Sequence, residues 1–227
     1  MKVFCSLCDC EIKNITADLF FRIEDYLISS GVASDKEEFS VIKERLQNPP
    51  ILSADEFAEE VFYVILASGF RQKIAKQKFC EIVSFIKNGG VVNVENLLPI
   101  FGNKNKINAI CKVWHNREKF CRDFYSCETI AEKMEVLCLL PHIGKITKNH
   151  LARNLGINDV KYDVWIQRLG IALYGDDSMK VGFPLSVDVK SVCDKLFHFI
   201  EKETGLVRGY IDVVLWKACQ IGVLEFR

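Results

Sequence analysis

The sequence predicts an all-α protein, and three observations support that fold class. Apolar residues recur with helical spacing in nearly every segment, and the alternation typical of strands is scarce. Helix caps and breakers separate the segments: Ser53 is followed three positions later by Glu56, as in a capping box, and Pro49-Pro50 interrupts the chain just before them. The segments can therefore be assigned to separate helices.

In chain order, the periodicity predicts helices near residues 17–30, 35–47, 54–69, 71–88, 104–116, 118–126, 128–140, 145–154, 161–174, 188–204 and 208–222. Ser34 and Asp188 are the expected N-caps of the second and tenth of these helices. We expect one continuous helical domain over residues 53–170. A second helical domain is expected from both chain ends, residues 1–52 and 171–227.

The composition is typical of a globular protein. The 227 residues are 49% hydrophobic and 26% charged, which gives enough apolar material for one large core or two small ones. No apolar run has the roughly 18 residues that a membrane span requires. The first residues also lack the apolar core of a signal peptide. The sequence therefore predicts a cytoplasmic protein without membrane contact.

The ten cysteines indicate free thiols, because the chain is large and carries no secretion signal. Five of them lie among apolar residues in helical segments and are expected to be buried: Cys80, Cys111, Cys138, Cys193 and Cys219. Cys5, Cys8 and Cys10 resemble one half of a metal site, but no fourth ligand follows at a matching spacing. We therefore expect no bound metal.

The formal net charge of zero argues against broad electrostatic attraction to nucleic acid. Basic side chains nevertheless cluster in two stretches: Lys104, Lys106, Lys112, Arg117, Lys119 and Arg122 in the first, and Lys145, Lys148 and Arg153 in the second. Such clusters fit a DNA-facing surface and equally an ordinary solvated helix face.

Residues 134–157 have the layout of a helix-hairpin-helix. A helix with apolar Val136, Leu137 and Leu140 ends at Pro141, and a short turn containing Gly144 follows. The second helix is expected to point three side chains inward: Ile146, Leu151 and Leu155. Backbone N–H groups at the start of that helix favour an anion such as a DNA phosphate. An ordinary αα-hairpin has the same spacing.

The continuation of this stretch resembles a known family. LPHIGKIT, residues 140–147, looks like the LPGIGxxT hairpin of the helix-hairpin-helix DNA glycosylase superfamily. In that family an aspartate follows in a pattern like D-x-x-[IV]-x-R, which Asp163 to Arg168 matches. The resemblance covers residues 54–170. It implies two helical domains with the active-site cleft between them, and excision of a damaged base from duplex DNA.

The resemblance implies that Asp163 is the catalytic carboxylate, which stabilises the positive charge that develops on the sugar as the base departs. Without the family, Asp163 reads as the N-cap of the helix that follows it, and both roles are compatible.

The expected DNA contacts lie in the hairpin turn and at one helix junction. In the turn they are His142, Gly144, Lys145 and Thr147, and at the junction near residue 70 the contact is Gln72, with Phe70 as the alternative. His142 replaces the first glycine of the family turn, where a positive φ costs a non-glycine residue energy. Either the turn is distorted, or His142 itself touches phosphate, or it is a passive surface histidine.

The chain departs from the bifunctional members of the family at the nucleophilic lysine. The matching position is Ile146, and helical geometry directs the neighbouring Lys145 and Lys148 away from the face of Ile146. The sequence therefore predicts a monofunctional enzyme that uses water and lacks lyase activity. We also expect it to be a monomer and to need no cofactor.

The C-terminal stretch 201–222 is similar to a segment of archaeal 8-oxoguanine glycosylases in which an aspartate and a tryptophan line the base pocket. Here they are Asp212 and Trp216, which share one helix face. A carboxylate can accept guanine N–H groups and an indole can stack on the base. A guanine-like oxidised purine is the expected substrate. An alkylated base, a non-catalytic DNA-binding protein and an all-α scaffold remain alternatives.

Overall fold

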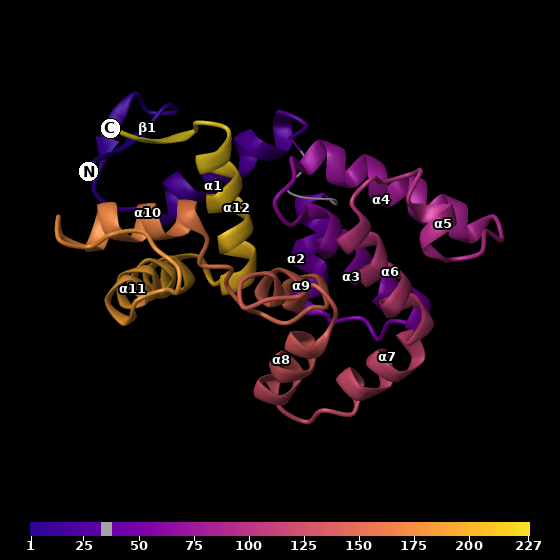
Figure 1. The fold of residues 1–227 in the computed structure, drawn as a ribbon. Helices are drawn as coiled ribbons and strands as arrows, with labels where there is room; N and C mark the ends of the chain where they lie inside the picture. Colours follow the sequence, from indigo (N-terminus) through magenta and orange to yellow (C-terminus); the bar gives the residue numbers. More distant parts are fainter. Residues whose placement is uncertain (33–37) are drawn as a thin grey trace. The chain divides into compact units, whose positions relative to one another are not determined.

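The computed structural model describes residues 1–32 and 38–227, and helices dominate it (Figure 1). The helices are α1 (Ala17–Ser29), α2 (Phe39–Gln47), α3 (Ala54–Ala67), α4 (Gln72–Lys87), α5 (Val94–Leu97), α6 (Lys104–His115), α7 (Arg117–Tyr125), α8 (Ile130–Leu139), α9 (Thr147–Asn154), α10 (Val164–Tyr174), α11 (Val187–Thr204) and α12 (Arg208–Gln220). The chain divides into two compact units. We name residues 1–47 with 158–227 the end unit, and residues 48–157 the middle unit.

The predicted helical fold is confirmed, with one small sheet in addition. Strands β1 (Val3–Cys5), β2 (Cys10–Ile12) and β3 (Leu224–Phe226) form an antiparallel sheet in the order β2-β1-β3. Both chain ends meet at β1 (Figure 1), where Lys2 and Arg227 exchange two backbone hydrogen bonds. Strands of three residues are too short to show an alternating pattern, so the sequence did not reveal them.

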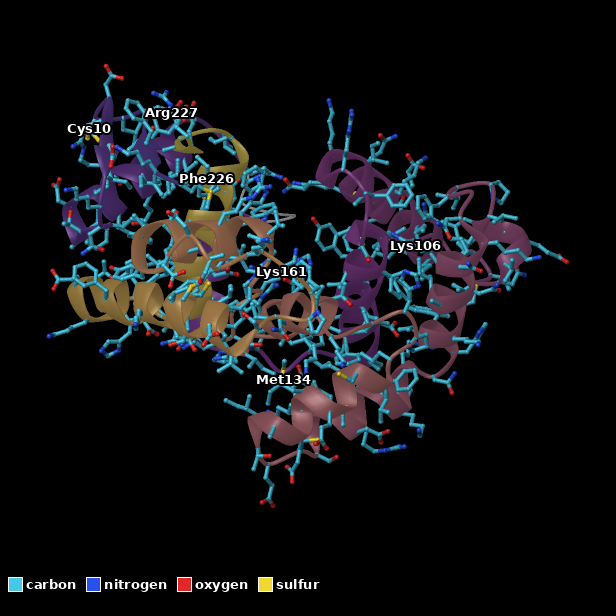
Figure 2. The ribbon with its side chains drawn as sticks, turned by 60° about the vertical axis from the view of Figure 1, so that its left-hand side comes forward. Cys10, Lys106, Met134, Lys161, Phe226 and Arg227 are labelled. Atoms are coloured by element: carbon cyan, nitrogen blue, oxygen red, sulfur yellow. The ribbon has the colours of Figure 1, made fainter. Side chains whose placement is uncertain are left out.

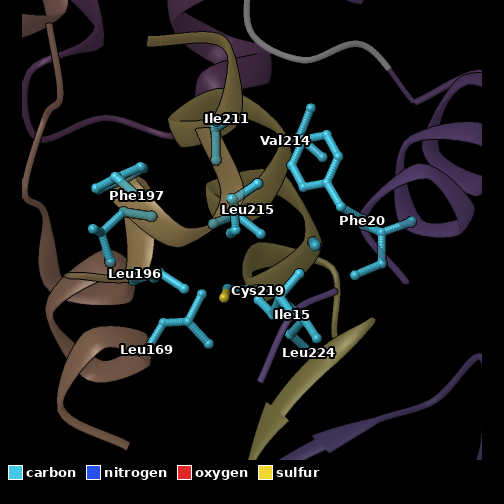
Figure 3. Close-up of a cluster of buried hydrophobic side chains, with 14 of the residues drawn as sticks. Ile15, Phe20, Leu169, Leu196, Phe197, Ile211, Val214, Leu215, Cys219 and Leu224 are labelled. Atoms are coloured by element: carbon cyan, nitrogen blue, oxygen red, sulfur yellow. The ribbon is translucent and has the colours of Figure 1, made fainter. Parts of the chain in front are cut away.

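The core of the end unit collects side chains from both chain ends. Figure 3 shows Ile211, Val214 and Leu215 of α12 surrounded by residues of its neighbours. Helix α10 packs closely on α11: a Cβ at Gly170 would lie 2.7 Å from Cys193 Sγ. Glycine is therefore required at this crossing, and it fixes how closely the two helices approach.

The middle unit is built around α3. This helix is buried along most of its length and packs against α4, α6, α7 and α9. It begins with the predicted capping box, in which Ser53 and Glu56 each accept a backbone N–H from the other. Its core is separate from that of the end unit, so each unit has its own apolar interior.

The predicted domain limits of 53 and 170 need correction to 48 and 157. Helix α10 packs on α11 and α12, and its buried Ile166 and Leu169 belong to the core of the end unit. At the other limit, Leu52 N–H donates to the Tyr125 hydroxyl at 2.9 Å, which joins residues 48–52 to the middle unit. Both limits depend on contacts with partners that are distant in the sequence.

One predicted N-cap changes, one helix was not predicted, and part of another predicted helix lies outside the described residues. Helix α11 is capped by Ser186, and Asp188 lies in its first turn. The sequence did not suggest the single turn α5, because four residues carry no periodicity. Of the helix expected over 35–47, residues 39–47 form α2, whereas Ser34 and residues 35–37 lie outside the described residues.

The cysteine expectation holds for three of the five helical positions. Cys111, Cys193 and Cys219 are buried free thiols, but Cys80 and Cys138 are exposed. A search of the described residues finds no helix with the length and apolarity of a membrane span.

Candidate functional site

The predicted hairpin is present in the middle unit as α8, a turn over residues 140–146, and α9. His142 takes a φ of 66°, so the turn keeps the left-handed conformation that glycine usually supplies. Leu140 and Ile143 are buried and anchor the turn to the core. The turn is therefore not distorted. The two remaining alternatives for His142 are contact with a phosphate and a passive position on the surface.

Ile146 does not point inward as expected, because it is the N-cap residue of α9 and precedes the helix. Its side chain is 39% exposed, and Ile143 occupies the buried position instead. The helical geometry that would direct Lys145 away from Ile146 does not hold either, since neither residue belongs to α9. Helical geometry therefore gives no reason to reject Lys145 as a nucleophile.

Thr147 closes the turn. The Gly144 N–H donates to Thr147 Oγ1 at 2.7 Å, and the Thr147 hydroxyl donates to the Gly144 carbonyl at 3.3 Å. Ile146 provides no side-chain acceptor at the start of α9. The first turn of α9, with exposed Lys145 beside it, thus combines N–H donors and a positive charge.

The α3–α4 junction, residues 68–71, lies in the same unit and is held by Lys106 of α6 (Figure 2). The Lys106 ammonium donates to the Leu66 carbonyl at 3.0 Å and to the Ser68 carbonyl, and it lies 4.4 Å from the centre of the Phe70 ring. Lys106 is only 4% exposed, contrary to its expected place in a basic surface cluster. Its side chain therefore stabilises the C-terminal end of α3.

Burial lowers the pKa of Lys106 to about 8. Partial burial and the charge of Lys106 lower the pKa of His142. Phe70 is 41% exposed at the junction, and Gln72 is the first residue of α4.

Asp163 lies in the end unit as the N-cap of α10. Its Oδ1 accepts hydrogen bonds from Trp165 N at 2.9 Å and Ile166 N at 3.2 Å. Its charge also adds to the effect of burial in raising the pKa of the Cys219 thiol. The capping interpretation is therefore correct, and it fixes the direction of the carboxylate.

Two side chains hold the backbone just before Asp163. The Tyr162 hydroxyl donates to Asp194 of α11, and burial together with this hydrogen bond raises the pKa of Tyr162. The fully buried Gln167 donates its amide to the Tyr162 carbonyl at 2.9 Å and accepts the Gly182 N–H at 3.0 Å. Asp163 is thus preceded by a residue that is fixed through both its side chain and its backbone.

Asp212 and Trp216 lie on α12, which packs against α10 in the same unit. Asp212 is 1% exposed, and its Oδ2 accepts the Lys161 N–H at 3.4 Å. The Lys161 ammonium (Figure 2) lies 5.9 Å from the centre of the Trp216 ring. Lys161 therefore links both Asp212 and Trp216 to the segment that leads to Asp163.

The structure thus divides the predicted site residues between the units. The end unit holds Asp163, Asp212 and Trp216, and the middle unit holds His142, Gly144, Lys145, Thr147 and Gln72. Sequence reasoning missed Lys161, Tyr162, Gln167 and Asp194, and placed Lys106 on the surface. Their contacts join distant segments, and no local pattern signals them. Among the described residues, no group of three or more His, Cys, Asp or Glu side chains is arranged to hold a metal ion.

No family model and no curated protein matches the sequence, whereas solved structures match the fold. The 8-oxoguanine glycosylase/lyase of Methanocaldococcus jannaschii, crystallised with a 15mer DNA containing 8-oxoguanine, matches with a TM-score of 0.64 and 21% identity, over 92% of this chain and 100% of that one. A second structure of the 8-oxoguanine DNA glycosylase from this organism gives 0.64 and 20% identity, over 90% and 94% of the two chains. The 8-oxoguanine DNA glycosylase of Thermotoga maritima gives 0.62 and 15% identity, over 92% and 99%. This chain therefore has the fold of archaeal and bacterial 8-oxoguanine DNA glycosylases.

Proposed function

We propose that this protein is a DNA repair glycosylase that flips a damaged base out of duplex DNA and cleaves its N-glycosidic bond. The observation that carries the proposal is the likeness in fold, over nearly the whole of both chains, to three structures of 8-oxoguanine glycosylases. The hairpin with its left-handed turn and the capping carboxylate Asp163 supply the parts that such a reaction needs. In this proposal the protein acts in the cytoplasm as a monomer and uses no cofactor.

Asp163 is the proposed catalytic residue. As the base departs, C1′ of the sugar takes on oxocarbenium character, and a fixed carboxylate stabilises that charge. The two N–H donors of α10 and the anchored Tyr162 keep the carboxylate in place before DNA binds. Such preorganisation means that little rearrangement is needed at the moment of reaction.

The decisive experiment compares Asp163→Asn with the wild type on duplexes that carry a panel of modified bases. Asparagine also caps helices well, so the fold is retained while the charge is lost. We expect base excision to fall by about a hundredfold or more, with duplex binding unchanged. Thermal melts serve as the control for folding. Wild-type excision by Asp163→Asn would refute the catalytic role, and no excision by the wild type on any lesion would favour a non-catalytic DNA-binding protein.

We further propose that water attacks C1′ and that the enzyme lacks lyase activity. The supporting observation is Ile146, whose alkyl side chain cannot form a Schiff base. Products should stay unbroken until alkali is added. Borohydride trapping of a protein–DNA adduct would contradict this proposal, and Lys145→Met and Lys148→Met would then identify the amine.

Duplex contacts are proposed at the hairpin through His142, Gly144, Lys145 and Thr147, and at the α3–α4 junction through Gln72. A phosphate oxygen would accept N–H groups from the turn and the first turn of α9, beside the Lys145 ammonium. Because such contacts do not read sequence, Lys145→Met should weaken binding to all duplexes alike and reduce its salt dependence. A loss confined to one lesion would argue against this assignment.

Asp212 and Trp216 are proposed to form the pocket for a guanine-like oxidised base such as 8-oxoguanine. Trp216 supplies a partly exposed indole for stacking, and Lys161 brings a positive charge over it. The burial of Asp212 also supports a second role, in which it holds the Lys161 backbone and so the segment before Asp163.

Asp212→Asn and Asp212→Ala separate these two roles. Loss of excision on guanine-like lesions alone supports the pocket, with an expected tenfold to hundredfold effect from about 1–3 kcal/mol for an unpaired donor. An equal loss on every lesion, alkylated bases included, supports positioning of the backbone instead.

A further inference from the structure

A cluster of three thiols lies in the β1–β2 hairpin of the end unit, and none of them has a part in the proposed function. Cys5 and Cys10 face each other in the register of the two strands, and Cys8 lies in the turn between them. Cys8 Sγ and Cys10 Sγ are 2.9 Å apart. This separation is within about 0.9 Å of a disulfide bond length, so little movement separates the free thiols from a bond.

Backbone geometry explains why these two thiols meet. In an extended strand, residues i and i+2 share a face but are too far apart for their Sγ atoms to touch. Asp9, between the two cysteines, takes a φ of 49°, in the left-handed region. That conformation curls the chain and brings the two side chains together.

The three thiols differ in their surroundings. Cys5 is buried and Cys8 is half-buried against the core. Cys10, which Figure 2 labels, is exposed. The hydrogen bond with Cys10 lowers the pKa of Cys8, and the nearby charge of Arg22 adds a smaller effect in the same direction. Arg22 itself donates to the Leu7 carbonyl at 3.3 Å and so stays next to the turn. Cys8 is thus set up as a nucleophile and Cys10 as its accessible partner.

We propose that Cys8 and Cys10 form a reversible redox-active dithiol that is oxidised by peroxides. The Cys8 thiolate attacks one peroxide oxygen, so that an S–O bond forms, the O–O bond breaks and hydroxide leaves as water after protonation. The Cys10 sulfur then attacks Cys8 sulfur, an S–S bond forms, and the sulfenic oxygen leaves as a second water with the Cys10 proton. Two thiols are oxidised by two electrons and one hydrogen peroxide becomes two waters. A small dithiol reverses the bond by exchange.

A metal site is the competing assignment for this cluster. It would need Cys5 as a third ligand, and the described residues contain no group of three ligands with suitable geometry. The pairing of Cys8 with Cys10 needs no third ligand, which is why the dithiol is favoured.

Peptide mass spectrometry tests the proposal on the intact folded protein. Trypsin releases residues 3–13, which contain all three thiols of the cluster. After a brief exposure to hydrogen peroxide, and alkylation of free thiols, this peptide should carry one internal disulfide and one alkyl group, on Cys5. Dithiothreitol should restore three alkylated thiols.

Matched variants make the outcome decisive. Cys5→Ser should still form the disulfide, whereas Cys8→Ser and Cys10→Ser should not, and thermal melts check that each variant is folded. Exposed Cys138 in the same sample reports ordinary thiol reactivity and should remain alkylated under these conditions. A disulfide to Cys5, oxidation of Cys8 and Cys138 at equal rates, or stoichiometric zinc retention that depends on Cys5 would each overturn the proposal.

Discussion

At the scale of single residues, the turn of the hairpin places a histidine in a backbone conformation that glycine usually adopts. His142 adopts the φ of 66° that a glycine takes without strain. For an L-residue this conformation costs roughly 1–2 kcal/mol, which the buried Leu140 and Ile143 on either side must offset. A residue with a strained backbone therefore lies at a point where we propose DNA contact.

We predict that His142→Gly raises the free energy of unfolding by about 1 kcal/mol. Glycine removes the backbone strain, but it also increases the conformational entropy of the unfolded chain, which cancels part of this gain. Urea denaturation measures the change. His142→Ala is the matched control, since it removes the imidazole and keeps the Cβ. An equal gain in both variants would show that the imidazole, and not the backbone, is the source.

At the scale of elements, α6 holds the α3–α4 junction through one buried amine. Lys106 crosses to the carbonyls at the end of α3 and also lies against Phe70. The junction is therefore fixed by a group that can lose its charge, because burial brings the pKa of Lys106 to about 8. Its titration should be visible in the stability of the protein.

Lys106→Met should change how stability depends on pH. Below pH 8 the amine is charged in both states and the full burial penalty is present. Between about pH 8 and the ordinary lysine value of 10.5, the folded state releases its proton first, so wild-type stability rises relative to the variant. The rise should approach about 3 kcal/mol. Denaturation at pH 7.5, 9 and 10 measures it.

The matched control for this prediction is Lys104→Met, since Lys104 lies exposed on the same helix. It should keep the wild-type pH dependence. A parallel pH dependence of Lys106→Met and the wild type would show that the buried amine does not titrate in this window.

At the scale of the whole molecule, the two apolar cores are separate and differ in continuity. The core of the middle unit comes from one uninterrupted stretch, whereas that of the end unit needs segments on both sides of it. We therefore expect residues 48–157 to fold alone, with helical circular dichroism and a cooperative thermal transition. A matched fragment, residues 158–227, lacks β1, β2 and α1 and should not fold. Non-cooperative melting of the 48–157 fragment would contradict the independence of its core.

Features that depend on neighbouring residues could be predicted from the sequence, whereas features that depend on contacts between distant residues were missed. Helices and the Ser53 cap follow from neighbours three or four positions apart, so their patterns were readable. The domain limit at 170 was wrong because α10 packs mainly on α11 and α12, which follow it in the sequence. The burial of Lys106 and the exposure of Ile146 were missed because they depend on tertiary contacts and on where α9 begins.

The pairing of β1 with β3 has a consequence for how the protein is made. Synthesis proceeds from the N-terminus, so β1 and α1 emerge with their apolar faces uncovered long before residues 224–226 exist. The contiguous middle unit can fold on the ribosome in the meantime. For that interval the edge of β1 offers unpaired backbone groups to any other strand, including one from a neighbouring nascent chain. The rate at which the second half of the chain is translated thus sets how long the edge of β1 can pair with a wrong strand.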